Sequence, residues 1–130
     1  MAERPLSPHL TVYRWAYTMT LSILHRLSGV ALAVTLLGFV LWLVGASLGA
    51  DTYAAILPLL ICKPCKLVLS LAVAALIFHL CNGLRHLAWD MGWGFERADA
   101  RRSAALVALA TLIGTAVCCY FIFRPGAGGA

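Results

Sequence analysis

Long apolar stretches separated by short polar segments dominate the chain and indicate its fold class. Three of these stretches, residues 21–48, 65–89 and 104–123, are long enough to supply the ~20 residues that a membrane-spanning helix needs. The segment between the first two, residues 49–64, is expected to be a loop. The pattern therefore predicts an all-α membrane protein with three transmembrane helices, organised as a single membrane-anchor domain over residues 1–130.

The composition agrees with a membrane location. Hydrophobic residues make up 62% of the 130 residues and charged residues only 12%, which is more apolar surface than a soluble domain of this size can bury. The first apolar stretch exceeds the roughly 7–15 residues of a signal-peptide core, and no small-residue cleavage site follows it. No mitochondrial-type presequence precedes it either, so we expect a bacterial inner (plasma) membrane, with membrane lipid around the helices.

The net charge of +5 indicates topology and not nucleic-acid binding. Lys and Arg concentrate in the cytoplasmic segments of membrane proteins. Seven arginines lie before or at the start of the first span or between the second and third spans, against three basic residues elsewhere. This bias predicts a cytoplasmic N-terminus, a periplasmic C-terminus and no nucleic-acid partner. The first group is Arg4, Arg14, Arg26, Arg85, Arg97, Arg101 and Arg102, and the second is Lys63, Lys66 and Arg124.

His79 is the strongest functional signal, because it lies in the second span after an uncharged run over residues 67–78. Ionisable residues inside a membrane are costly and usually mark ligand, proton or ion sites. His79, Gly83, His86 and Asp90 are spaced 4, 3 and 4 residues apart, so a helix places them on one narrow stripe. A flat cofactor bound by His79 needs room one turn further on, which Gly83 supplies. The stripe suits haem b with its propionates near the membrane surface. The alternative is a histidine that only bonds a neighbouring helix, with Gly83 allowing close helix packing.

A second polar cluster opens the first span. Ser22, Arg26 and Gly29 fall on one helical stripe, with His25 at its edge. Because span one starts on the side of the membrane where span two ends, we expect this cluster at nearly the depth of His86. A hydroxyl, a guanidinium and two imidazoles together can bind a quinone carbonyl and a haem propionate. The alternative for Arg26 alone is a basic anchor whose side chain extends to the membrane surface.

The segments RPLSPHLTVYRW, SILHRLSG and HLCNGLRHLAWD occur in this order between residues 4 and 90. Together they resemble the cytochrome b subunits of succinate dehydrogenase, the large membrane anchors of respiratory complex II. The N-terminal segment is most similar to the mitochondrial and alphaproteobacterial branch. The resemblance implies that the chain binds haem b together with a second, small anchor subunit. It also implies that electrons pass from an iron–sulfur subunit to ubiquinone at a site to which this chain contributes.

The same resemblance implies roles for individual residues. His79 matches the histidine that is an axial ligand of the haem iron, and the other ligand comes from the small anchor subunit. Ser22, Arg26 and Trp15 match residues that line the ubiquinone site. The residues implied to lie on the propionate side of the haem are His25, His86 and Arg26.

The chain lacks motifs for the succinate chemistry itself. It contains neither a GxGxxG motif nor a cysteine run able to hold an iron–sulfur cluster. The resemblance assigns flavin, clusters and succinate oxidation to peripheral flavoprotein and iron–sulfur subunits, so we expect a non-catalytic anchor that forms part of the quinone site. The alternatives are a fumarate reductase anchor working with menaquinol, a structural anchor without haem, and an unrelated small membrane cytochrome or transporter fragment.

Two of the five cysteines form a CKPC motif between the first two spans. Lys66 follows Cys65 where a CxxCH haem-attachment motif would require histidine. No second CxxC is present to complete a zinc site. Free thiols or a local disulfide between Cys62 and Cys65 are therefore favoured over a bound metal, and the motif lies outside the family pattern.

Overall fold

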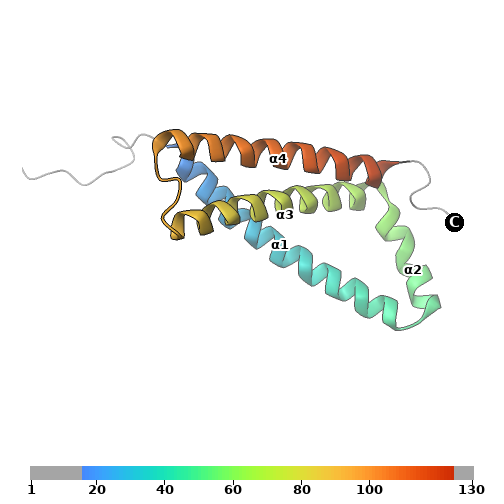
Figure 1. Cartoon of the computed structure of the whole chain (residues 1–130). Helices are drawn as coiled ribbons and strands as arrows, with labels where there is room; N and C mark the ends of the chain where they lie inside the picture. Colours follow the sequence, from blue (N-terminus) through green and yellow to red (C-terminus); the bar gives the residue numbers. More distant parts are fainter. Residues whose placement is uncertain (1–15, 125–130) are drawn as a thin grey trace, which may run out of the picture.

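The computed structural model describes residues 16–124, and these residues form four helices (Figure 1). The helices are α1 (Tyr17–Ser47), α2 (Ala50–Ile61), α3 (Lys63–Asp90) and α4 (Arg97–Phe123). Helices α1, α3 and α4 are each long and apolar enough to cross a membrane. The predicted all-α fold with three transmembrane spans is confirmed, and no strand occurs within residues 16–124.

Polar turns next to the apolar stretches extend the helices beyond the predicted spans. Helix α1 begins at Tyr17 instead of residue 21, and α4 begins at Arg97 instead of residue 104. In α4, Asp99 lies in the first turn, where its negative charge interacts favourably with the helix dipole. In α3, Pro64 lies in the first turn, where a helix does not use the missing N–H. None of the three helices has a side-chain hydrogen bond at its N-cap within the described residues, so Asp99 and Pro64 favour the starts of α4 and α3 through the first turn alone.

Helix α2 occupies residues that the sequence pattern assigned to a loop, and that prediction was wrong. The helix has 12 residues, so it rises only about 18 Å and cannot cross a bilayer by itself. Gly49, with φ of 118°, turns the chain between α1 and α2, a conformation that favours glycine. Cys62 has an extended backbone and separates α2 from α3. The search for apolar stretches of ~20 residues did not detect α2, because its apolar run is shorter than a membrane span.

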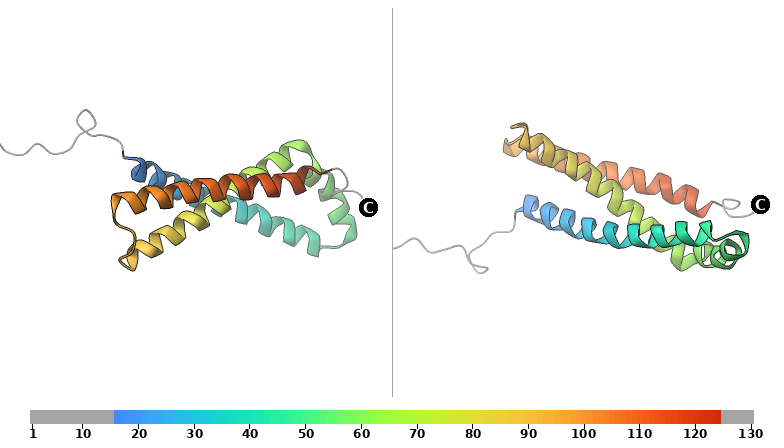
Figure 2. Two further views of the ribbon diagram at one scale, coloured as in Figure 1. Left: turned by 45° about the horizontal axis from the view of Figure 1, so that its top comes forward. Right: turned by 90° about the horizontal axis from the view of Figure 1, so that it is seen from below.

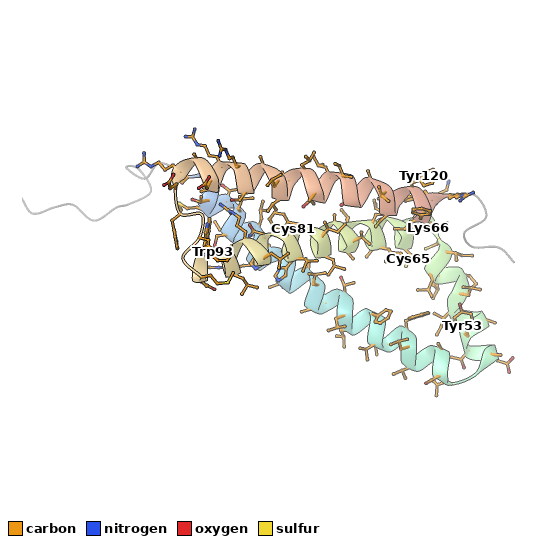
Figure 3. The ribbon with its side chains drawn as sticks, viewed as in Figure 1. Tyr53, Cys65, Lys66, Cys81, Trp93 and Tyr120 are labelled. Atoms are coloured by element: carbon orange, nitrogen blue, oxygen red, sulfur yellow. The ribbon has the colours of Figure 1, made fainter. Side chains whose placement is uncertain are left out.

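Helices α3 and α4 lie side by side, whereas α1 crosses α3 and then diverges from it (Figures 1 and 2). The bundle therefore has two unlike ends. The histidine end comprises the start of α1, the end of α3 and the start of α4. The α2 end comprises the end of α1, the whole of α2, the start of α3 and the end of α4. Trp93 lies at the histidine end, and Tyr53 and Tyr120 lie at the α2 end (Figure 3), as expected of aromatic residues near the two membrane surfaces.

The interior of the bundle is polar and its exterior is apolar. The buried polar or charged residues in the described range are Ser28, Ser70, Asn82 and Arg85. Only Ala100 and Val107 are buried among the described hydrophobic residues, while many leucines, valines and isoleucines are exposed on every long helix. This arrangement suits a chain whose outer faces contact lipid tails or the helices of other subunits.

Arg85 does not lie in the loop between α3 and α4. The prediction that placed it among the basic residues between spans two and three was therefore wrong. Arg85 lies within α3 and is only 6% exposed. Arg97, Arg101 and Arg102 belong to the exposed first turns of α4, and the arginine bias keeps its direction without Arg85. The orientation of the termini stays a prediction, and Arg4 and Arg14 lie outside the described residues.

Candidate functional site: a histidine pocket between α1 and α3

An open pocket of about 560 Å³ lies between α1 and α3 at the histidine end. It brings together two polar clusters that are far apart in the sequence. Trp15, the remaining residue expected at the site, lies outside the described residues. The lining residues are Ser22, His25 and Arg26 from α1 and His79, Leu80, Gly83, Leu84, His86 and Leu87 from α3.

Three imidazoles lie close together in the pocket, and two of them are stacked. The rings of His25 and His79 lie 3.9 Å apart between centroids and only 12° from parallel. The ring of His86 follows at 5.2 Å from His25, tilted by 48°. His25, placed at the edge of its stripe by the sequence pattern, therefore lies between the two histidines of α3. Its buried Nδ1 has no hydrogen-bond partner in the described part of the chain.

The hydrogen bonds of His79 define which ring nitrogen faces a ligand. Its Nδ1 lies 3.0 Å from the His25 carbonyl oxygen and 3.0 Å from Ser28 Oγ. A carbonyl oxygen can only accept, and Ser28 Oγ already donates to the same carbonyl at 2.7 Å, so Nδ1 of His79 carries the proton. The Nε2 atom then keeps its lone pair and bonds no other residue within 16–124. Metal-bound histidines characteristically donate their second ring nitrogen to a carbonyl in this way.

Two glycines make room for the stacked rings, but not in the manner expected. A Cβ at Gly29 of α1 would lie 3.0 Å from Cε1 of His79, so this glycine permits the close approach of α1 to that ring. A Cβ at Gly83 would lie 3.7 Å from Cε1 of His25, which is an ordinary contact. Gly83 borders the pocket, but the glycine that faces His79 is Gly29. Sequence spacing along one helix could not reveal a contact made from another.

Ser22 and Arg26 present unused polar groups to the pocket. The hydroxyls of Ser28, Ser70 and Ser103 each donate to a carbonyl three or four residues earlier in the helix, a common use of serine in helices. No such bond is made by Ser22, and no hydrogen bond or ion pair involves the Arg26 side chain among the described residues. Both side chains are therefore available for a ligand.

Residues 1–118 match the family model described as the succinate dehydrogenase/fumarate reductase transmembrane subunit. The chain belongs to this family. Among its relatives, the succinate dehydrogenase cytochrome b556 subunit of Rickettsia typhi is 45% identical over 94 residues, covering 72% of this chain and 73% of the relative. The mitochondrial succinate dehydrogenase cytochrome b560 subunits of Mus musculus and Homo sapiens are 40% and 34% identical, covering 85% and 86% of this chain and 68% of each relative. Membership, together with three apolar spans, makes this a multi-pass membrane protein.

Behind the pocket, this transmembrane subunit contains a buried polar network that the sequence reading missed. Asn82 is 0% exposed. Arg85 donates from Nη1 to Asn82 Oδ1 at 3.3 Å and from Nε to Ser103 Oγ at 3.0 Å. Its Nη2 donates to the Ala100 carbonyl at 3.3 Å, and its guanidinium lies 4.0 Å from the ring centre of Trp89. The sequence does contain a signal for this network, because Asn82 and Arg85 lie one turn apart inside a predicted span and such polar residues usually face another helix.

The other residues considered from the sequence lie away from the pocket. Asp90, the last member of the His79 stripe, is exposed at the end of α3. Cys62 and Cys65 are free thiols, and Cys62 Sγ donates to the Leu59 carbonyl at 2.9 Å. Among residues 16–124, no group of three or more His, Cys, Asp or Glu side chains surrounds a common metal position. A metal held here by His79 would therefore need further ligands from outside this set.

Proposed function

We propose that this transmembrane subunit is the cytochrome b anchor of succinate dehydrogenase. It holds one side of a b haem through His79 and forms part of the site where ubiquinone is reduced. The observation that carries the proposal is the bond from His79 Nδ1 to the His25 carbonyl, which leaves Nε2 free for iron. The names of the relatives, succinate dehydrogenase cytochrome b subunits, support the same assignment.

The residues around His79 fit a haem whose binding is shared with another chain. The pocket is open, so a second small anchor subunit could contribute a further ligand to the haem iron beside His79. The buried, unpartnered Nδ1 of His25 suits a propionate oxygen, and His86 and Arg26 line the same pocket. When bound, a b haem supplies one-electron redox chemistry at this position.

Ser22 and Arg26 bind the ubiquinone carbonyl on the α1 side of the pocket. Reduction places negative charge on the quinone oxygens, and a preoriented hydroxyl and guanidinium stabilise that charge through hydrogen bonds. Neither side chain has another partner in the described range, so neither must break a protein bond to bind the substrate. Trp15 is proposed to pack against the quinone ring, in line with the resemblance, and its place lies outside the described residues.

The anchor works within a larger assembly. Iron–sulfur and flavoprotein subunits dock at the cytoplasmic membrane surface and carry out succinate oxidation, and electrons reach the pocket from the iron–sulfur subunit. The membrane is the bacterial inner membrane, with the histidine end on its cytoplasmic side. This placement puts Ser22 and Arg26 close to the incoming electrons.

A reduced-minus-oxidised optical spectrum of the purified complex tests the haem assignment. We expect a b-type band in the wild type that is lost or markedly altered in His79→Leu, because leucine cannot donate to iron while the helix remains apolar. His86→Leu is the matched variant and should have a milder effect, since His86 lies at the haem edge and does not bind iron. An unchanged spectrum and haem content in His79→Leu would eliminate His79 as a ligand.

An anchor for fumarate reductase is the second candidate, because the matching family model covers both enzymes. The same pocket would then oxidise menaquinol. Quinone-specific assays on membranes discriminate the two, since a fumarate reductase should prefer a low-potential menaquinol donor over ubiquinone as acceptor.

A further inference from the structure

A chain of hydrogen bonds connects buried Arg85 to His86 at the pocket. Asn82 stands between them, accepting at Oδ1 from Arg85 Nη1 at 3.3 Å and approaching His86 Nε2 with Nδ2 at 3.4 Å. The same Nδ2 donates to the Leu21 carbonyl of α1 at 3.5 Å. Asn82 is fully buried and Arg85 nearly so, so water does not compete for these bonds.

The direction of each bond follows from what the groups can donate. A guanidinium has only donors, so the amide oxygen of Asn82 must face Arg85 and the amide nitrogen must face His86 and Leu21. The Leu21 carbonyl, which can only accept, requires the same amide orientation. An amide nitrogen donates, so Nε2 of His86 must accept and cannot carry a proton. The single proton of a neutral His86 is then on Nδ1.

We propose that Arg85 is a positioning residue that acts through Asn82 to hold His86 as the Nδ1–H tautomer. His86 thereby offers the pocket a hydrogen-bond donor at Nδ1, for which no partner exists among the described residues. Given the proposed function, on which this part rests, that donor suits a haem propionate or another carboxylate oxygen. Without the network, the ring would be free to present an acceptor, which repels a carboxylate.

The surroundings of His86 restrain the ring as well as its proton. The Trp89 ring meets it edge-on, 5.4 Å away at 85°, and the His25 ring lies on the pocket side at 5.2 Å. Arg85 packs against Trp89 and donates to Asn82. Its guanidinium therefore supports both α3 side chains that contact His86. Arg85 itself does not line the pocket, which is why it positions and does not bind.

The tautomer can be read directly by nitrogen NMR of the intact complex with ¹⁵N-labelled histidine, where the protonated ring nitrogen couples to its hydrogen. The His86 signals are assigned by their loss in His86→Phe. We expect a proton on Nδ1 and none on Nε2 in the wild type. In the double variant Asn82→Leu/Arg85→Leu, the population should move at least roughly fivefold toward Nε2–H, the form an isolated imidazole prefers, because one hydrogen bond has been removed.

The double variant is chosen because it removes both partners and leaves no buried charge unpaired, so the complex should still assemble. Ser103→Ala removes only one acceptor of Arg85 and should leave the tautomer unchanged, as should Arg101→Gln, which alters an exposed arginine on α4. A proton on Nε2 in the wild type, or an unchanged ratio in the double variant, would overturn the proposal.

Failure of the haem assignment is separable from failure of this inference. The tautomer measurement does not need haem, so it is repeated in the His79→Leu complex, where His86 should still carry its proton on Nδ1. A complex without a b-type band but with the expected tautomer would refute the haem assignment and retain the role of Arg85. A complex with a b-type band and an Nε2 proton on His86 would retain the haem assignment and refute the role of Arg85.

Discussion

At the histidine end, side-chain hydrogen bonds join α1, α3 and α4, whereas no side-chain hydrogen bond links two helices among the described residues of the α2 end. The bonds that cross between helices, from His79, Ser28, Asn82 and Arg85, all lie at the histidine end. At the α2 end, the hydroxyls of Ser47 and Ser70 bond carbonyls of their own helices. Apolar contacts distinguish poorly between a neighbouring helix and lipid, while hydrogen bonds fix relative position. The fold is thus specified where the chemistry is expected and left adaptable elsewhere.

The largest effect is expected from removing pocket polar groups. Arg26→Leu and Ser22→Ala should lower ubiquinone reductase activity roughly ten- to hundredfold, since one charge-assisted hydrogen bond is worth about 1.5–3 kcal/mol. Succinate oxidation with an artificial dye acceptor should survive, because that chemistry lies in other subunits. Ser70→Ala, at the α2 end, is the matched control and should leave both assays unchanged. A parallel fall in both assays would mean that Arg26 and Ser22 serve assembly.

Two glycine substitutions compare the rigidity of the ends. Gly29→Ala places a methyl group 3.0 Å from the hydrogen-bonded ring of His79, and this overpacking should cost about 1–3 kcal/mol. Gly45→Ala meets Ile56 Cδ1 at 2.5 Å, but that is the end of a flexible side chain. Here the gain in helix propensity, up to ~1 kcal/mol, should offset the strain.

Unfolding of the purified complex by heat, together with the position of the b-type band, measures both glycine variants. Gly29→Ala should lower the midpoint and shift the band, and Gly45→Ala should do neither. A larger loss from Gly45→Ala would show that the α2 end is the better-defined part of the bundle and would reverse the comparison.

The smallest effect on function is expected at Cys62, an exposed thiol at the α2 end. Cys62→Ser should leave quinone reductase activity unchanged, because Cys62 does not line the pocket and its Sγ donates to the Leu59 carbonyl three residues earlier. In the wild type, a membrane-impermeant thiol reagent should label Cys62 from the periplasmic side and lose that label in Cys62→Ser. Alkaline phosphatase fused at the C-terminus should likewise be active, and inactive when fused after Asp99. The opposite pattern would invert both ends relative to the membrane.

The spans could be predicted from the sequence because a bilayer imposes one length and one polarity on every crossing helix. The short helix α2 could not be predicted in this way, because its 12 residues are too few for a span and too apolar for a typical loop. Helix starts at Tyr17 and Arg97 also escaped prediction, because charged and polar turns remain helical beyond the hydrocarbon.

Site residues on one stripe of one helix were predictable, and contacts between helices were not. Ser22, Arg26, His79 and His86 were brought together by matching depth, and the structure places them around one pocket. The stacking of His25 on His79 depends on how α1 crosses α3, which spacing along either helix does not contain. Arg85 was misread for the same reason, as its partner Ser103 belongs to the next helix.

The buried guanidinium of Arg85 has a consequence for how the chain enters the membrane during synthesis. A buried arginine in an isolated helix opposes insertion, by about 2.5–3.5 kcal/mol at the helix centre and by less near the helix end, where Arg85 lies. Asn82 travels in the same helix and can accept from Arg85 at once, but Ser103 and the Ala100 carbonyl arrive only with α4. Helices α3 and α4 should therefore leave the insertion machinery together as a hairpin, so that the Arg85 guanidinium has its hydrogen-bond acceptors before the two helices reach lipid.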